Sequence, residues 1–154
     1  MALNISSKGT WPANVLSNFA ATPFVLDGIE CASAEGFIQA LKFPDPEMQR
    51  MVCQLVGLAA KKRGQSATKR VVRRNKVWWQ GREFEFRSKE HFALVERGLM
   101  AKFTQSDRSR RALIATEGMT LRHDLGHPES AQISLPARVF IRILNRIRDD
   151  ILAG

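Results

Sequence analysis

The segment Ser33-Ala34-Glu35-Gly36-Phe37-Ile38-Gln39-Ala40-Leu41-Lys42-Phe43 predicts one short helix. At about 100° per residue, Glu35, Gln39 and Lys42 fall on one stripe, and the apolar residues fall on the other side, toward a core. A carboxylate, an amide and an ammonium group therefore project from one face. If this face is solvated, it is an ordinary surface. If it lines a pocket, it is a catalytic acid or base with two polar positioning groups.

The chain before this helix predicts short strands. Residues 2–6 can form an edge strand, and residues 24–26 and 29–31 flank Asp27-Gly28, a dipeptide that tolerates the positive φ values of a hairpin turn. We expect Ser33 to cap the helix by accepting from its free N–H groups. Pro44 ends the helix, because the residue before a proline avoids the α region.

The chain after it predicts mostly helices. Asp45-Pro46 begins one, Gly57 interrupts it and Gly64 ends that segment. Its expected apolar face consists of Met48, Met51, Val52, Leu55 and Val56.

The second half predicts two more strands and three helices. The strands are expected at 83–86 and 119–123, and the helices at 89–103, from Ser106 or Asp107 to 114, and after Ser134. Ser88 and Ser134 are expected to cap the first and last of these helices. The prediction is a single α+β domain over residues 1–154, mostly helical with a small antiparallel sheet.

Composition restricts the class of protein. The net charge is +9, which favours phosphates, nucleic acid or acidic surfaces as partners, although a basic surface also serves solubility. No signal peptide and no apolar run of membrane-spanning length is evident. Cys31 and Cys53 predict reduced, buried thiols in a cytoplasmic protein.

A basic block covers residues 61–76 and contains no acidic residue. Trp78 and Trp79 follow it, so charge and stacking together could hold a nucleotide. The alternative is a solvated helical face beside a core tryptophan. Adjacent residues of a strand point to opposite sides, so we expect one tryptophan inside and one outside.

Other site types have little support. The segment His123-Asp124-Leu125-Gly126-His127 could suggest a metal site, but no third ligand group is evident. There is no Gly-rich phosphate loop, GxSxG or His-Glu-x-x-His motif. Glu35 alone, in a first helical turn, is usually a partner of the helix dipole.

Several segments resemble the NADAR family of YbiA-like proteins. The first block comprises Leu16-Ser17-Asn18-Phe19, residues 23–28, Ser33-Ala34-Glu35 and Gln39–Phe43. Residues 101–105 and 113–116 match a second signature, and residues 143–149 match the closing helix. The likeness covers about residues 16–152.

This resemblance implies an N-glycosidase acting on ribosides joined to nitrogen. One branch of the family removes ADP-ribose from guanine in DNA, as an antitoxin to a DNA-modifying toxin. Another branch cleaves phosphorylated riboflavin-pathway ribosylamino-pyrimidines. A non-catalytic module that binds ADP-ribose or nucleic acid is the alternative from another class. No cofactor or metal is implied.

The resemblance also assigns residues. Glu35 matches the glutamate regarded as catalytic. The matching pocket positions are Asn18, Phe19, Gln39 and Lys42, and Trp78 or Trp79 lies where the family has a site tryptophan. Ser17 and Lys102, within the matching segments, are further candidates for substrate binding. Two departures stand out. Gly36 replaces the histidine that usually follows the glutamate, and residues 123–128 replace a Trp-Gly-rich loop, with Asp124 standing in for its acidic residue.

The mechanism expected from these residues centres on Glu35. Loss of a nitrogen base builds positive charge on the ribose, which a carboxylate stabilises while it activates water. Lys42, Asp124 or water would give a proton to the leaving nitrogen. Lys102 and the 61–76 block would hold phosphates, and Phe19 with a tryptophan would stack on a ring.

Overall fold

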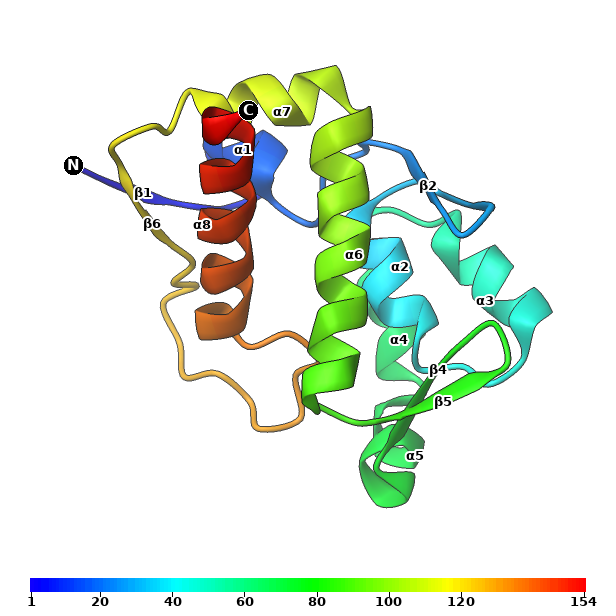
Figure 1. Cartoon of the computed structure of the whole chain (residues 1–154). Coiled ribbons are helices and arrows are strands. Elements are labelled where there is room, and N and C mark those ends of the chain that lie inside the picture. Colours follow the sequence, from blue (N-terminus) through cyan, green and yellow to red (C-terminus); the bar gives the residue numbers. More distant parts are fainter.

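Two long helices, α6 (Lys89–Gln105) and α8 (Ala137–Ala153), run side by side and form the frame of the molecule (Figure 1). The computed structural model describes residues 1–154. The other helices are α1 (Ala13–Leu16), α2 (Ala34–Ala40), α3 (Pro46–Cys53), α4 (Gly57–Gln65), α5 (Thr68–Arg74) and α7 (Asp107–Ile114). None of the helices combines the length and the apolar composition that crossing a membrane requires.

The strands form three separate pairs. Two are the antiparallel hairpins β2 (Phe24–Leu26) with β3 (Ile29–Cys31), and β4 (Lys76–Trp79) with β5 (Arg82–Glu85). The third pair joins β1 (Ala2–Asn4) and β6 (Thr120–Arg122) in parallel. The α+β class and the 24–31 hairpin are therefore confirmed. The pairs do not unite in one antiparallel sheet, since each strand has only one partner and β1 and β6 run parallel.

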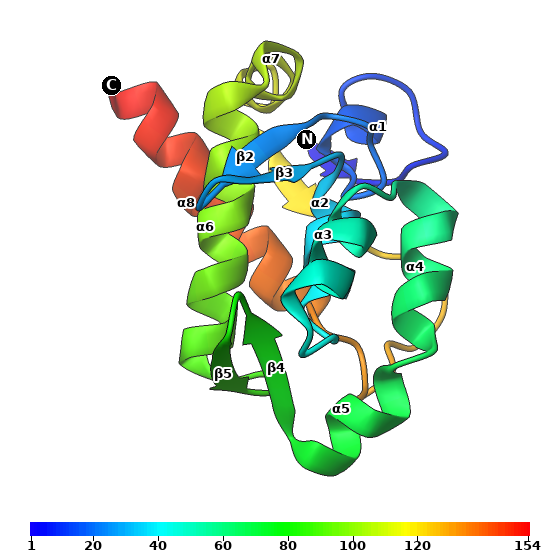
Figure 2. The ribbon, with the colours of Figure 1, turned by 90° about the vertical axis from the view of Figure 1, so that its right-hand side faces the viewer.

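Helix α2 lies at the centre, against α3, α4 and α6 (Figure 2). Ser33 caps it as predicted, since its Oγ accepts from the Gly36 N–H at 3.0 Å. Its buried Phe37 ring meets the Trp79 ring edge-on, with centroids 5.1 Å apart. A Cβ at Gly98 of α6 would overlap the Phe37 ring, so glycine at this position allows α2 and α6 to approach closely.

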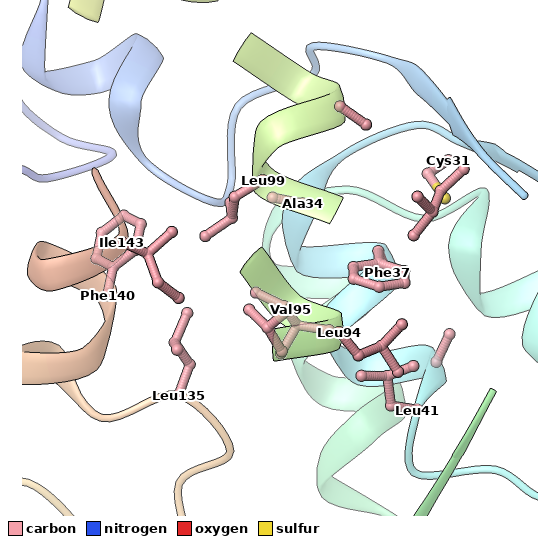
Figure 3. Close-up of a cluster of buried hydrophobic side chains, with 14 of the residues drawn as sticks. Cys31, Ala34, Phe37, Leu41, Leu94, Val95, Leu99, Leu135, Phe140 and Ile143 are labelled. Carbon is pink, nitrogen blue, oxygen red and sulfur yellow. The ribbon is translucent and has the colours of Figure 1, made fainter. Parts of the chain in front are cut away.

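Helix α6 joins the two halves of the core. Figure 3 shows its side chains between those of α2 on one side and those of α8 on the other: Leu94, Val95 and Leu99 between Phe37 and Phe140 with Ile143. The thiols Cys31 and Cys53 are free and buried, as predicted.

Several local predictions were wrong. Val52 is buried as predicted, but Met51 and Val56 are exposed: Met51 lies on the outer side of α3, and Val56 lies beyond the end of that helix, at the start of α4. Gly64 lies within α4 rather than after it. Ser134 does not cap α8, which begins after Pro136; Glu129 Oε2 accepts from the Ala137 N–H at 2.7 Å in its place.

Both tryptophans of β4 are buried, so the expected inside-outside alternation is wrong. The Trp78 N–H donates to the Leu41 carbonyl at 2.8 Å, and the Trp78 carbonyl accepts from Gln49 Nε2 at 2.6 Å. Trp79 Nε1 donates to Asp27 Oδ2 at 2.8 Å. Alternation applies to a strand with one solvated face, and β4 is enclosed by α2, α3 and the first hairpin.

Candidate active site

A cavity of about 560 Å³ lies beside α2, and five distant parts of the chain line it. They are the segment after β1, the segment after α1, one face of α2, Lys61 of α4, and the loop that follows β6. Its lining residues are Ser6–Lys8, Ser17–Phe19, Glu35, Ile38, Gln39, Lys61, His123–Leu125, His127 and Ile133–Leu135. The polar face of α2 is therefore a wall of this cavity.

Glu35 is held in place from both backbone and side chain. Its N–H donates to the Asn18 carbonyl at 2.9 Å, which attaches the first turn of α2 to the Ser17-Asn18-Phe19 segment. Its Oε2 accepts from Gln39 Nε2 at 2.7 Å, as the spacing of four residues along a helix allows. No cation forms an ion pair with it.

The chemistry of Glu35 follows from these surroundings. Burial raises the pKa of its carboxyl group, because the charged form loses hydration. The hydrogen bond from Gln39 and the positive charges of Lys42 and Lys61 oppose this rise. A desolvated carboxylate on a cavity wall is placed to exchange protons with a bound molecule. A solvated glutamate that only interacts with the helix dipole is not placed in this way.

The Ser17-Asn18-Phe19 segment lies next to Glu35 in the cavity lining. Ser17 Oγ accepts from the Phe19 N–H at 3.1 Å, so the segment is fixed by a local turn. The buried Asn18 Oδ1 has no protein partner. Since buried polar atoms are normally paired, this oxygen is available to a bound molecule.

Lys102 supports this segment from the core. Its side chain is fully buried, and its Nζ donates to the Ser17 carbonyl at 3.1 Å. Burial lowers the pKa of Lys102 to about 7, and the charge of Arg108 adds to the effect. Lys102 does not line the cavity, so the expected direct contact with a phosphate is wrong for the observed geometry.

Lys42 also lies outside the cavity lining. Its Nζ donates to Thr68 Oγ1 at 3.0 Å and so joins the end of α2 to α5. Burial lowers the pKa of Lys42 to about 8, and the charge of Glu35 opposes this shift. The positive charge of Lys42 therefore acts on Glu35 from outside the cavity lining.

Trp78 and Trp79 are in the core and do not reach the cavity. The expected stacking of a tryptophan on a substrate ring is therefore wrong for this structure. Phe19 is the only aromatic ring of a Phe or Trp that lines the cavity. It lies against Gly57, whose positive φ of 54° turns the chain into α4.

Gly36 has a structural explanation. A Cβ at this position would lie 2.5 Å from the Leu55 carbonyl oxygen and 3.0 Å from that of Cys53. The position faces the end of α3 and is absent from the cavity lining. A side chain here would displace backbone, so glycine permits the close approach of α2 and α3.

Sequence reasoning did not assign Ser6, Ser7, Lys8 and Ser134 to the site. They reach the cavity through the β1–β6 pair and the loop before α8, and no local pattern predicts either approach. Asp124 lines the cavity as proposed, and its Oδ1 also accepts from the Gly126 N–H at 2.9 Å. The structure contains no cluster of three His, Cys, Asp or Glu side chains that could hold a metal ion around His123 or elsewhere.

Comparison with known proteins agrees with this architecture. Residues 10–149 match the family described as Bacteriophage protein GP30.3. The chain is 36% identical over 151 residues to the uncharacterized 17.1 kDa protein in the Gp30-rIII intergenic region of Enterobacteria phage T4, covering 97% of this chain and 98% of that protein. The NMR structure of the E. coli protein YbiA is similar with a TM-score of 0.67 at 19% identity, covering 96% of this chain and 82% of that one. The resemblance seen in the sequence is thus confirmed: the chain belongs to the Bacteriophage protein GP30.3 family and has the YbiA-like fold.

Proposed function

We propose that this protein is an N-glycosidase that hydrolyses a bond between ribose and nitrogen. The observation that carries the proposal is the Glu35 carboxylate on the cavity wall, oriented by Gln39 and not neutralised by any ion pair. Departure of a nitrogen base leaves positive charge on the sugar, and a carboxylate beside the anomeric carbon stabilises that charge. The raised pKa of Glu35 also makes it a stronger base toward water.

The remaining lining residues support a riboside ligand. Asn18 Oδ1 can accept from a ribose hydroxyl or a base N–H group. Phe19 offers a ring face for stacking. Lys8 and Lys61 are the lysines of the lining and would hold phosphate oxygens.

As substrate we infer ADP-ribose joined to guanine in DNA, which would make the protein an antitoxin-like enzyme. Lys61 belongs both to the cavity lining and to the basic surface of α4 and α5. We define this basic surface as Lys61, Lys62, Arg63, Lys69, Arg70, Arg73 and Arg74. None of these residues forms a salt bridge, and all except the half-buried Arg70, which donates to the Lys42 carbonyl, are exposed. The exposed charges could meet the phosphates beside a modified nucleotide.

A phosphorylated ribosylamino-pyrimidine is the second candidate substrate. The cavity volume of about 560 Å³ suits a small molecule, and one phosphate needs no extended basic surface. The candidate from another class is a binding module without turnover, which Gly36 in place of the family's histidine would favour. The geometry weakens this interpretation, because position 36 faces α3 rather than the cavity.

The test uses both substrates and a matched pair of variants. Wild-type protein is incubated with ADP-ribosylated DNA and, separately, with a ribosylamino-pyrimidine phosphate, and the released sugar phosphate is measured by chromatography. We expect Glu35→Gln to lower kcat on the cleaved substrate by about 10²- to 10⁴-fold. The control is Glu30→Gln, an exposed glutamate on β3 that is expected to keep full activity.

Two results would count against the proposal. Full activity of Glu35→Gln would remove the assigned mechanism. Tight binding of both molecules without release of product would favour the binding module instead.

A further inference from the structure

The loop after β6 brings two histidines, His123 and His127, to the same cavity as Glu35. His123 lines the cavity, and its Nδ1 lies 3.0 Å from the Ile5 carbonyl oxygen. A carbonyl oxygen only accepts, so Nδ1 must carry the hydrogen of this bond. The other nitrogen, Nε2, has no protein partner and is not buried, so it is open to the cavity that the ring lines.

Contacts with α8 and β1 hold the His123 ring and its neighbour Asp124 in place. The His123 ring meets the Phe140 ring of α8 edge-on, with centroids 5.2 Å apart. The next residue is attached to β1 twice: the Asp124 N–H donates to Asn4 Oδ1 at 2.7 Å, and Asn4 Nδ2 donates to the Asp124 carbonyl at 2.9 Å. The parallel pair of β1 and β6 (Figure 1) thus fixes the position of the imidazole. The Ile5 carbonyl keeps a hydrogen on Nδ1, so Nε2 is the nitrogen that can gain and lose a proton.

We propose that His123 is the general acid of the cavity, and this proposal rests on the N-glycosidase function proposed above. Hydrolysis needs two proton movements, one from water and one to the leaving nitrogen. Glu35 suits the first movement. Two side chains were expected to supply the second movement. Lys42 lies outside the cavity lining and is bonded to Thr68, and Asp124, which does line the cavity, already accepts from the Gly126 N–H through its Oδ1. Of the two histidines in the lining, His123 has its ring held by the Ile5 carbonyl and the Phe140 ring, whereas His127 is exposed and its Nδ1 lies 3.1 Å from the carbonyl oxygen of its own neighbour Pro128. In the protonated His123 ring, Nε2 carries the hydrogen that can be donated.

The oxygen of water attacks the anomeric carbon while Glu35 takes one proton from that water. The electron pair of the bond between carbon and nitrogen goes to the leaving base, which receives the Nε2 proton of the His123 imidazolium. The products are a sugar with a new hydroxyl group and a protonated base. Glu35 is left protonated and His123 neutral, and one proton exchanged with solvent restores both.

Two substitutions of His123 separate proton donation from support of the loop. Asparagine keeps an N–H donor near the position of Nδ1, so His123→Asn retains the bond to the Ile5 carbonyl and lacks Nε2. We expect a loss in kcat of about 10²- to 10⁴-fold with KM within about twofold of wild type. His123→Gly opens a space for a small ring. Added imidazole is expected to restore turnover, and pyrazole, a ring of the same size but far less basic, is expected not to.

Thermal unfolding followed by circular dichroism checks that both variants fold. Full activity of His123→Asn would overturn the assignment. Equal rescue by imidazole and pyrazole, or rescue by neither, would also overturn it, since a role in packing predicts no difference between the two rings. If His123→Asn is fully active while Glu35→Gln is inactive, this inference fails and the N-glycosidase proposal stands. If wild-type protein cleaves neither substrate, both fail.

Discussion

Burial changes the chemistry of three charged residues around the Ser17-Asn18-Phe19 segment. It raises the pKa of Glu35, and it lowers the pKa of Lys42 to about 8 and that of Lys102 to about 7. Only Glu35 reaches the cavity. Lys42 and Lys102 lie outside the cavity lining, where they donate hydrogen bonds to Thr68 Oγ1 and to the Ser17 carbonyl.

Lys102→Met tests the buried ammonium through the pH dependence of stability. Between pH 7 and the ordinary lysine value of 10.5, the folded protein binds fewer protons at Lys102 than the unfolded chain does. The free energy of unfolding therefore rises with pH across this window, by at most about 1.4 kcal/mol per pH unit for one proton. We expect Lys102→Met to lack this contribution, most clearly between pH 7 and 8, below the window of Lys42.

Urea unfolding at a series of pH values measures this slope. Lys89→Met, at an exposed position of α6, is the control that is expected to keep it. The same slope in Lys102→Met and in wild type would contradict the prediction.

At the scale of the elements, the approach of α2 to α4 sets the geometry of Glu35. The Gln39 side chain lies between Glu35 and Gly64 of α4, and a Cβ at Gly64 would be 2.9 Å from Gln39 Cβ and would overlap the amide itself. Gly64 therefore serves the packing of Gln39 rather than the end of a helix. In an exposed helix, replacing glycine by alanine would stabilise by about 1 kcal/mol.

Gly64→Ala is expected to do the opposite here. Overpacking should lower the free energy of unfolding by about 1–3 kcal/mol, and displacement of Gln39 should lower activity through Glu35. Thermal unfolding and kcat measure the two effects.

A double-mutant cycle with Gln39→Ala provides the control. Because Gln39→Ala removes the amide that the new methyl would overlap and leaves only the Cβ contact at 2.9 Å, the two substitutions should be strongly non-additive in stability. Additive effects would show that Gly64 does not act through Gln39.

At the scale of the whole molecule, positive charge is unevenly paired. The net charge is +9, and the basic surface of α4 and α5 has no salt bridge. In both ribbon views α8 lies away from α4 and α5 (Figures 1 and 2). If the substrate is DNA, its phosphates should meet the α4–α5 side.

The salt dependence of binding to unmodified duplex DNA tests whether DNA binds on the α4–α5 side. We expect log Kd to depend steeply on log salt, and each phosphate contact removed should reduce the slope by about 0.9. The triple variant Lys69→Ser, Arg73→Ser and Arg74→Ser should flatten the slope. Exposed Arg138 and Arg142 of α8, replaced by serine, form the control and should leave it unchanged. Equal effects of the two variants would place DNA elsewhere, and a shallow slope in wild type would favour the small phosphorylated riboside.

The sequence by itself determined the local features of this protein. The Asp27-Gly28 hairpin, the Ser33 cap and the common face of Glu35 and Gln39 follow from the backbone preferences of a few neighbouring residues, and each is observed. The resemblance to YbiA-like proteins also rests on short motifs, each made of neighbouring residues.

Only the tertiary structure decided which residues surround Glu35. The alternation predicted for Trp78 and Trp79 was wrong because helices enclose both sides of β4, and Lys102 proved to be a buried support. His123 and Lys8 reach the cavity because β1 pairs with β6 across more than a hundred residues. The physical reason is that burial and desolvation depend on segments that are distant in sequence, whereas turns, caps and helical faces depend on neighbours.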